Sequence, residues 1–174
     1  VTVDPNNSNI VWVGLINKKG IYRSEDGGLT WTRLTNGIEE SNIRGFSVEP
    51  GNSDVVYATG EIGSWAWANE QVTGHTQDMV KGIVYKTTDA GKSWTPIWKG
   101  DNLARYVIID PNNVNIVYIS TGIFDREAAN SNWENGEPGG EGIIKSYDGG
   151  KTWEQINNGL ANLYVGSFAM NPLN

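Results

Sequence analysis

An eight-residue turn motif occurs three times in the chain and constrains its fold more than any other feature. The copies read SEDGGLTW at 24–31, TTDAGKSW at 87–94 and SYDGGKTW at 146–153. They share the order Ser/Thr, any residue, Asp, Gly/Ala, Gly, any residue, Thr/Ser, Trp. A motif that recurs in this way indicates a chain built from repeated units, each of which packs against its neighbours.

A second phrase precedes each turn motif and completes the repeat. It reads VDPNNSNIVWVG at 3–14, VEPGNSDVVYAT at 48–59 and IDPNNVNIVYIS at 109–120, and a further copy begins with MNPLN at 170–174. Each unit therefore runs through an apolar segment, a proline turn, a second apolar segment, a variable connection, a Gly-Ile segment, the Asp turn and a Trp-led segment. This order predicts four short antiparallel strands per unit.

Four antiparallel strands in a repeat of about 40–50 residues are typical of a β-propeller blade. The Asp turn resembles the Asp-box, or BNR, repeat. The phrase before it resembles the propellers of sortilin-type domains, xyloglucanase-like glycoside hydrolases and photosystem assembly factors. The resemblance covers nearly the whole chain and implies an all-β fold of four-stranded antiparallel blades. The family includes enzymes, receptors and assembly factors, so the fold alone does not select a function.

We expect a single propeller segment over residues 1–174 that contains about three blades. The expected divisions are blade 1 at about 1–40, blade 2 at about 41–100, blade 3 at about 101–160 and the start of a fourth blade at 161–174. Closed propellers have four to eight blades. The remaining blades would come from the same parent chain, which we favour, or from other copies.

The Asp turn is interpreted as a structural brace. The Asp carboxylate can accept hydrogen bonds from its own turn, the second glycine can adopt a positive φ, and the Trp can pack on a neighbouring blade. A catalytic or calcium-binding group is needed once, whereas this group occurs in every unit. The family resemblance also implies that Asp boxes lie away from the active site. The residues given this structural role are Asp26, Gly28, Trp31, Asp89, Gly91, Trp94, Asp148, Gly150 and Trp153.

Two long connections are the expected location of function. They occupy 61–81 and 122–141, whereas the matching connection of the first unit is only INKKG at 16–20. Long loops on a rigid scaffold concentrate binding residues. Their aromatic rings and polar groups suit sugars, although the same rings can instead anchor each loop to its blade. The tryptophans expected to form binding platforms are Trp65, Trp67 and Trp133.

Two arginines are expected at the same end of the molecule. Arg44 and Arg105 each lie six residues before the turn proline of their unit, at the start of the innermost strand, and the fourth unit has Gly166 there. The two guanidinium groups can bind a carboxylate or a charged glycan. The alternative, which we favour, is that they pair with acidic residues of the long connections.

Glu61 is the candidate for a catalytic carboxylate, because it follows a predicted strand and breaks the repeat. In xyloglucanase-like enzymes a catalytic Asp stands at a comparable place in an Asp-Ile-Gly-Gly phrase; here the phrase is EIGS at 61–64. Glycoside hydrolysis needs a second carboxylate. Asp125 or Glu127 can supply it, and the spacing does not select between them. A sialidase would need an arginine triad, and only two arginines are suitably placed.

Composition excludes several other functions. The net charge is −7 and no Lys/Arg cluster occurs, which argues against nucleic acid and anionic membranes as partners. The longest apolar runs are of strand length, which argues against membrane insertion. There is no cysteine, and His75 is the only histidine, so a thiolate metal site and a histidine cage are excluded within this sequence. We expect no cofactor, with calcium on the oxygen-rich segment 125–137 as the alternative.

The sequence therefore predicts a binding module of a secreted or cell-surface propeller protein, located outside the cell or in the periplasm. Its ligand would be a polysaccharide or a protein segment on the face formed by the long connections. One alternative is a segment of a xyloglucanase-like glycoside hydrolase. A second alternative is a structural or assembly propeller.

Overall fold

The predicted all-β architecture is confirmed. The computed structural model describes residues 1–15, 19–39, 41–63, 80–122 and 140–171. Within them the chain forms twelve strands and three four-stranded antiparallel sheets, each with its strands in sequence order. This order arises because each strand pairs antiparallel with the next strand along the chain.

The strand bounds follow the repeat. The first sheet contains β1 (Thr2–Val3), β2 (Val11–Leu15), β3 (Gly20–Ser24) and β4 (Thr32–Arg33). The second sheet contains β5 (Asn42–Glu49), β6 (Asn52–Gly63), β7 (Val80–Thr87) and β8 (Thr95–Gly100). The third sheet contains β9 (Ala104–Asp110), β10 (Asn113–Thr121), β11 (Ile143–Ser146) and β12 (Glu154–Gln155).

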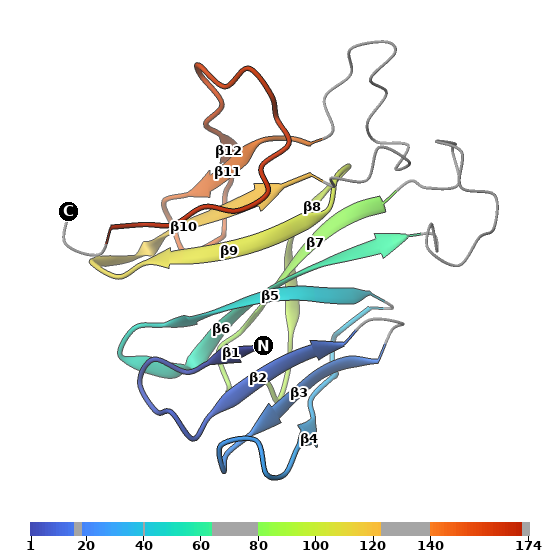
Figure 1. Ribbon diagram of the computed structural model, residues 1–174, viewed down its shortest axis with the longest axis vertical. Helices are drawn as coiled ribbons and strands as arrows, with labels where there is room; N and C mark the ends of the chain where they lie inside the picture. Colours follow the sequence, from blue (N-terminus) through green and yellow to red (C-terminus); the bar gives the residue numbers. More distant parts are fainter. Residues whose placement is uncertain (16–18, 40, 64–79, 123–139, 172–174) are drawn as a thin grey trace.

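The three sheets stack in sequence order, with the second sheet between the other two (Figure 1). The second and third sheets are joined by side-chain hydrogen bonds: Thr59 Oγ1 of β6 donates to the Arg105 carbonyl of β9 at 3.0 Å, and Ser47 Oγ of β5 accepts from the Ile109 amide of β9 at 3.3 Å. The sheets are therefore propeller blades that pack face to face. Among the described residues no helix is long and apolar enough to span a bilayer.

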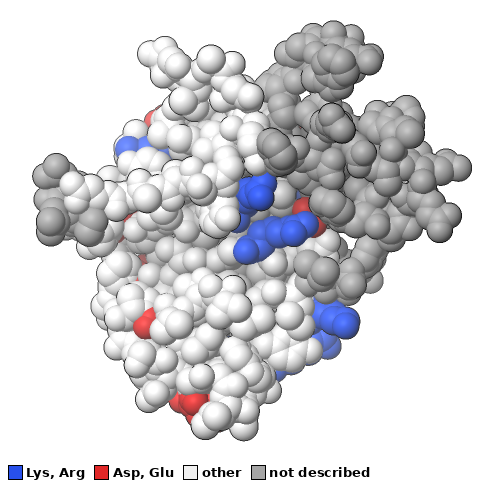
Figure 2. Space-filling view, in the orientation of Figure 1, with Lys and Arg blue, Asp and Glu red and all other residues white. Residues whose placement is uncertain are grey.

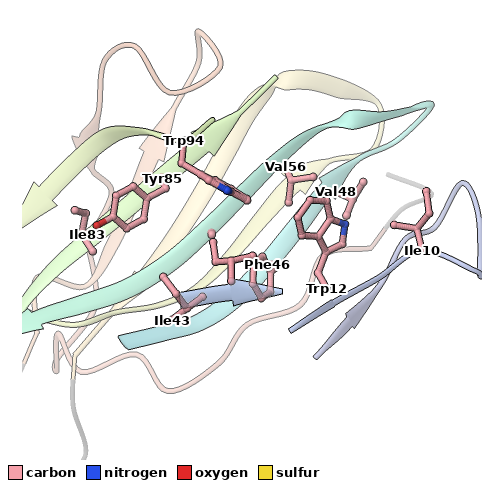
Figure 3. Close-up of a cluster of buried hydrophobic side chains, with 11 residues drawn as sticks. Ile10, Trp12, Ile43, Phe46, Val48, Val56, Ile83, Tyr85 and Trp94 are labelled. Carbon is pink, nitrogen blue, oxygen red and sulfur yellow. The ribbon is translucent and has the colours of Figure 1, made fainter. Parts of the chain in front are cut away.

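A cluster of buried aromatic rings joins the first sheet to the second (Figure 3). Trp12 of β2 is fully buried, and its ring centroid lies 5.8 Å from that of Trp94 in an edge-on arrangement and 6.1 Å from that of Phe46. Aromatic pairs at these separations stabilise a core beyond the area that they bury. The Trp of the second Asp turn therefore packs on the first sheet.

The third sheet packs on the second in the same manner. Trp153, directly before β12, donates from Nε1 to the Ile97 carbonyl of β8 at 3.1 Å. Tyr57 of β6 is fully buried and belongs to an apolar cluster with Val107, Ile109 and Val117 of the third sheet. Each of these Asp-turn tryptophans thus contacts the preceding sheet.

The segment 161–171 differs from its sequence-based expectation. We expected the innermost strand of a fourth unit there, but the segment has no strand geometry. It lies along the third sheet, where the Val165 amide donates to the Thr121 carbonyl at 3.0 Å and the Phe168 ring lies 6.5 Å from that of Tyr118. A strand is defined by a continuous ladder, and no described strand pairs with this segment in that way.

Candidate functional site

The two long connections leave the sheets on one side of the molecule. β6 ends at Gly63 and β7 begins at Val80, while β10 ends at Thr121 and β11 begins at Ile143. These four strand ends lie on the right in Figure 1. Because strands alternate in direction, the Asp turns join the opposite ends. We call the side with these four strand ends the loop side.

Glu61 is a buried carboxylate on the loop side. It belongs to β6, where it lies opposite Asn42 of β5 and Gly82 of β7, and it is 5% exposed. Its Oε1 accepts hydrogen bonds from Asn42 Nδ2 at 2.9 Å and from the Arg44 guanidinium. Its Oε2 is buried and has no hydrogen-bond partner in the described part of the chain. A buried carboxylate oxygen without a partner is costly, so Oε2 can still accept a hydrogen bond.

The two arginines lie on adjacent innermost strands. Arg44 forms an ion pair with Glu61, and its side chain is 30% exposed. The backbone of Arg105 lies against β5, since a Cβ atom at Gly45 would be 3.1 Å from the Arg105 carbonyl oxygen. The Arg105 guanidinium donates to Tyr164 Oη at 3.2 Å. Basic side chains lie next to an acidic one near the middle of the face in Figure 2.

Several sequence-predicted site residues lie outside the described residues. They are Trp65, Trp67, Asp125, Glu127, Trp133 and the oxygen-rich segment 125–137. Their roles as platforms, second carboxylate and calcium ligands stay predictions. In the part of the chain that the structure describes, no group of three or more acidic or histidine side chains is placed to hold a metal ion.

Sequence reasoning missed two residues of this site. Asn42 contacts Glu61 because the register of β5 and β6 places them opposite each other, and residue order alone does not reveal register. Tyr164 contacts Arg105 although the repeat places Gly166 at the equivalent position of the fourth unit. The sequence signal that could have identified this contact was the aromatic side chain of Tyr164, two positions before Gly166.

The Asp turns use one hydrogen-bond pattern three times. In the second sheet, Thr87 Oγ1 donates to Asp89 Oδ1 at 2.7 Å and accepts from the Gly91 amide at 3.0 Å. The amide and hydroxyl of Ser93 donate to the two oxygens of Asp89 at 2.9 and 2.6 Å. Asp26 and Asp148 accept the equivalent bonds in their turns. Both oxygens of each carboxylate are therefore used inside the turn.

The turn also needs two residues with positive φ. Gly28, Gly91 and Gly150 have φ values of 98°, 86° and 91°. The residue before each also has positive φ, and in the second sheet this residue is Ala90 at 58°. An alanine in the left-handed region costs about 1–2 kcal/mol, which the hydrogen bonds of the turn offset.

These hydrogen bonds change the acidity of the turn carboxylates. The hydroxyl of Thr30 lowers the pKa of Asp26 to about 2, and the hydroxyl of Ser93 lowers the pKa of Asp89 to about 2. The pKa of Asp148 is lowered in the same way by Thr152. Each turn is thus built around an ionised carboxylate.

We expect Asp89→Asn to destabilise the chain at neutral pH and to lose this effect in acid. The folded-state pKa of Asp89 is about 2, below the unfolded value of about 3.9. The stabilisation is therefore complete above about pH 5 and disappears as the pH falls from about 4 to about 2. Urea unfolding at several pH values measures the difference, with Asp54→Asn at an exposed position of β6 as control. A difference that persists unchanged at pH 2 would contradict the ionised brace.

The fold matches solved β-propeller structures. An ancestral GH74 enzyme aligns with a TM-score of 0.59 and 22% identity over 89% of this chain and 18% of its own. The GH74 xyloglucanase from Xanthomonas campestris aligns with a TM-score of 0.56 and 16% identity over 88% of this chain and 20% of its own. At these identities the likeness shows the fold, a propeller of four-stranded blades.

Two curated relatives are also similar in sequence. A xyloglucanase of Paenibacillus sp is 30% identical over 108 residues, which cover 56% of this chain and 10% of the relative. A xyloglucanase of Hypocrea jecorina (strain QM6a) is 25% identical over 104 residues, 56% of this chain and 12% of the relative. The chain thus spans about a tenth of the length of these relatives.

A family model described as Sortilin-Vps10 (sortilin, neurotensin receptor 3) matches residues 19–167. Because this match covers most of the sequence, the chain belongs to the Sortilin-Vps10 family.

Proposed function

We propose that this chain is the glycan-binding part of a glycoside-hydrolase-like propeller, and that an extended polysaccharide such as xyloglucan lies across the loop side. The observation that carries the proposal is the buried Glu61 carboxylate, which has one oxygen held by Asn42 and Arg44 and the other without a described partner. The similarity to two xyloglucanases supports this choice of ligand.

The chemistry of these groups fits a neutral sugar. Sugar hydroxyls both donate and accept hydrogen bonds, and Glu61 Oε2 is an acceptor while the Arg44 guanidinium is a donor. The ion pair holds both side chains in one geometry, so less conformational entropy is lost when a ligand binds. Trp65, Trp67 and Trp133 would add stacking surfaces for the apolar faces of the sugar rings.

The opposite end of the molecule offers less to a ligand. The carboxylates of Asp26, Asp89 and Asp148 already accept hydrogen bonds from their own turns at both oxygens. The Asp turns, and the proline turns that precede the second strand of each unit, are also similar in sequence in every unit. These features favour binding on the loop side.

Binding to xyloglucan tests the proposal. In affinity gel electrophoresis we expect xyloglucan to retard the wild-type chain, and Glu61→Gln and Arg44→Gln each to weaken retardation about tenfold or more, the effect expected for losing a hydrogen bond to a charged group. Lys92→Ala, in the Asp turn of the second sheet, is the control and should migrate as wild type. Circular dichroism checks that each variant is folded. An unretarded wild-type chain, or retardation unchanged in Glu61→Gln, would contradict the proposal.

Hydrolysis is the second candidate, and the position of Glu61 favours it. Glu61 is an acid at the end of a central strand, in the EIGS phrase that resembles the xyloglucanase-like motif. A second carboxylate within about 5–10 Å would be required, and Asp125 is the proposed partner. Release of reducing sugar from xyloglucan measures this activity. Release that is undiminished in Glu61→Gln would remove Glu61 as the catalytic acid or base.

We propose an extracellular, cell-surface or periplasmic location, which suits a polysaccharide ligand. The proposed binding chemistry uses side chains of the loop side alone, so it requires no cofactor. The net charge of −7 makes nucleic acid a poor partner for this surface.

A further inference from the structure

The boundary between the second and third sheets contains a second buried oxygen atom that can still accept a hydrogen bond. Asn102, in the connection between β8 and β9, is 7% exposed, and its Oδ1 has no hydrogen-bond partner among the described residues. Glu61 Oε2 is likewise buried and without a described partner. Leaving two acceptors buried in this way costs free energy, which a bound hydrogen-bond donor would recover.

The strand register places these two residues on one face of the second sheet. Gly82 of β7 lies directly opposite Glu61 of β6, and opposite residues of an antiparallel pair direct their side chains to the same face. A Cβ atom at Gly82 would lie 2.0 Å from the Asn102 carbonyl oxygen. Thr59, two positions before Glu61 and so on the same face, donates to the Arg105 carbonyl. The connection that carries Asn102 therefore covers the face to which Glu61 points, at its loop-side end.

The equivalent residue of the preceding unit uses its polar atom inside the protein. Ser41 lies nine residues before the turn proline of its unit, as Asn102 does, and its hydroxyl is 3.1 Å from Tyr85 Oη. In the third sheet the ladder position of Tyr85 is taken by Ile144, whose side chain has no polar atom. The third unit thus keeps a polar side chain at this position but lacks the internal partner.

Glu141 holds the connection in place. Its Oε1 accepts hydrogen bonds from the backbone amides of Asp101 at 2.7 Å and Asn102 at 3.2 Å. Its own amide donates to Thr121 Oγ1 at 2.7 Å, at the loop-side end of β10. The backbone of Asn102 is therefore fixed before a ligand arrives, which reduces the entropy lost on binding.

The charges at this boundary favour a neutral donor. The ion pair with Arg44 balances the charge of Glu61, and the Asn102 side chain is neutral. A sugar hydroxyl can donate a hydrogen bond to either oxygen, whereas the carboxylate of an acidic sugar has no proton to donate. A metal cation would be repelled by the adjacent Arg44 guanidinium.

We propose that Asn102 is a second ligand-binding residue of the glycan site, and that Asn102 Oδ1 and Glu61 Oε2 accept hydrogen bonds from hydroxyl groups of the same bound sugar. This inference rests on the proposed function of the loop side. It adds that the recognised sugar is neutral and carries free hydroxyl groups at the two contacts. Glu141 acts as a positioning residue, because it reaches the ligand only through the backbone of Asn102.

Asn102→Leu separates a binding role from a structural one. In affinity gel electrophoresis with xyloglucan we expect this variant to be retarded about fivefold less or weaker, the effect of losing one hydrogen bond. We expect its free energy of unfolding to stay equal or to rise, because a buried acceptor without a partner is removed. An asparagine that is instead bridged to the protein by buried water would give lower stability with unchanged retardation, and this result would overturn the proposal.

Further variants and a second polysaccharide complete the test. Asn102→Ala should also weaken retardation, so the outcome does not depend on whether leucine fits. Asn113→Ala, at an exposed position at the opposite end of β10, is the control and should migrate as wild type. Polygalacturonate, an acidic polysaccharide, should retard the wild-type chain less than xyloglucan does, and stronger retardation by polygalacturonate would overturn the choice of a neutral sugar.

The same gels distinguish failure of this inference from failure of the proposed function. If xyloglucan does not retard the wild-type chain, the proposed function is wrong and this inference is wrong with it. If the wild-type chain is retarded and Glu61→Gln weakens retardation, but both Asn102 variants migrate as wild type, the proposed function stands and only the role of Asn102 is wrong.

Discussion

Replacing Trp94 with alanine is expected to lower the free energy of unfolding by about 3–5 kcal/mol, the cost of truncating a buried tryptophan. Trp94 is 3% exposed and packs edge-on against Trp12 at the boundary between the first and second sheets. Its backbone amide also donates to the Asn36 carbonyl at 2.9 Å, which keeps the turn in place around the cavity. The site therefore cannot collapse easily, and the upper part of this range is expected.

Trp31→Ala is the matched control, because Trp31 occupies the same position of the Asp turn in the first sheet. Trp31 is 41% exposed, so removal of its ring should cost less than about 1 kcal/mol. Urea unfolding of both variants measures the difference. Equal losses of stability would show that the tryptophan acts within its own turn and not as a contact between sheets.

Gly37→Ala is expected to lower the free energy of unfolding by about 2–4 kcal/mol, from backbone strain and steric overlap together. Gly37 has a φ of 84°, and an added Cβ would lie 2.0 Å from the Trp94 carbonyl oxygen. The second Asp turn would have to move away from the first sheet to make room. The substitution thus acts on the same boundary as Trp94→Ala, from the other side.

Gly51→Ala separates the effect of backbone strain from the effect of steric overlap. Gly51 has a similar φ of 79°, but no heavy atom lies within 4 Å of its added Cβ. We expect this substitution to lower the free energy of unfolding by only about 1–2 kcal/mol, from backbone strain alone. Thermal unfolding of both variants measures the contrast. If Gly37→Ala costs no more than Gly51→Ala, the first two sheets are not as closely packed as the structure indicates.

Most of the fold could be predicted from the repeat. Three copies of two phrases in constant order determine four strands per unit, since each strand pairs with the next along the chain. The structure differs from this prediction at 161–171. The sequence of this segment matches an innermost strand, but no described strand forms a ladder with it. Strand formation depends on a partner as well as on local sequence.

Details of the turn were harder to predict. The sequence indicates positive φ at Gly28, Gly91 and Gly150, because glycine is the residue that adopts it most readily. It does not indicate the same geometry at Ala90, which has a Cβ atom and nevertheless has a φ of 58°. The hydrogen bonds to Asp89 compensate for that strain.

The candidate site was only partly predictable. Glu61 stands out because it breaks the repeat, and the arginines because their position recurs. The hydrogen bond between Glu61 and Asn42 depends on the register of β5 and β6. The hydrogen bond from Tyr57 Oη to the Gly149 carbonyl depends on how the second and third sheets stack. Neither arrangement follows from spacing along the chain.

Hydrogen exchange in the presence of a xyloglucan oligosaccharide tests the central claim, that a glycan binds the loop side, most directly. We predict slower exchange at the start of β5 and at the end of β6, around Glu61, with no change in the Asp turn at 87–94. Protection confined to the Asp turns, or no protection anywhere at saturating oligosaccharide, would contradict the claim.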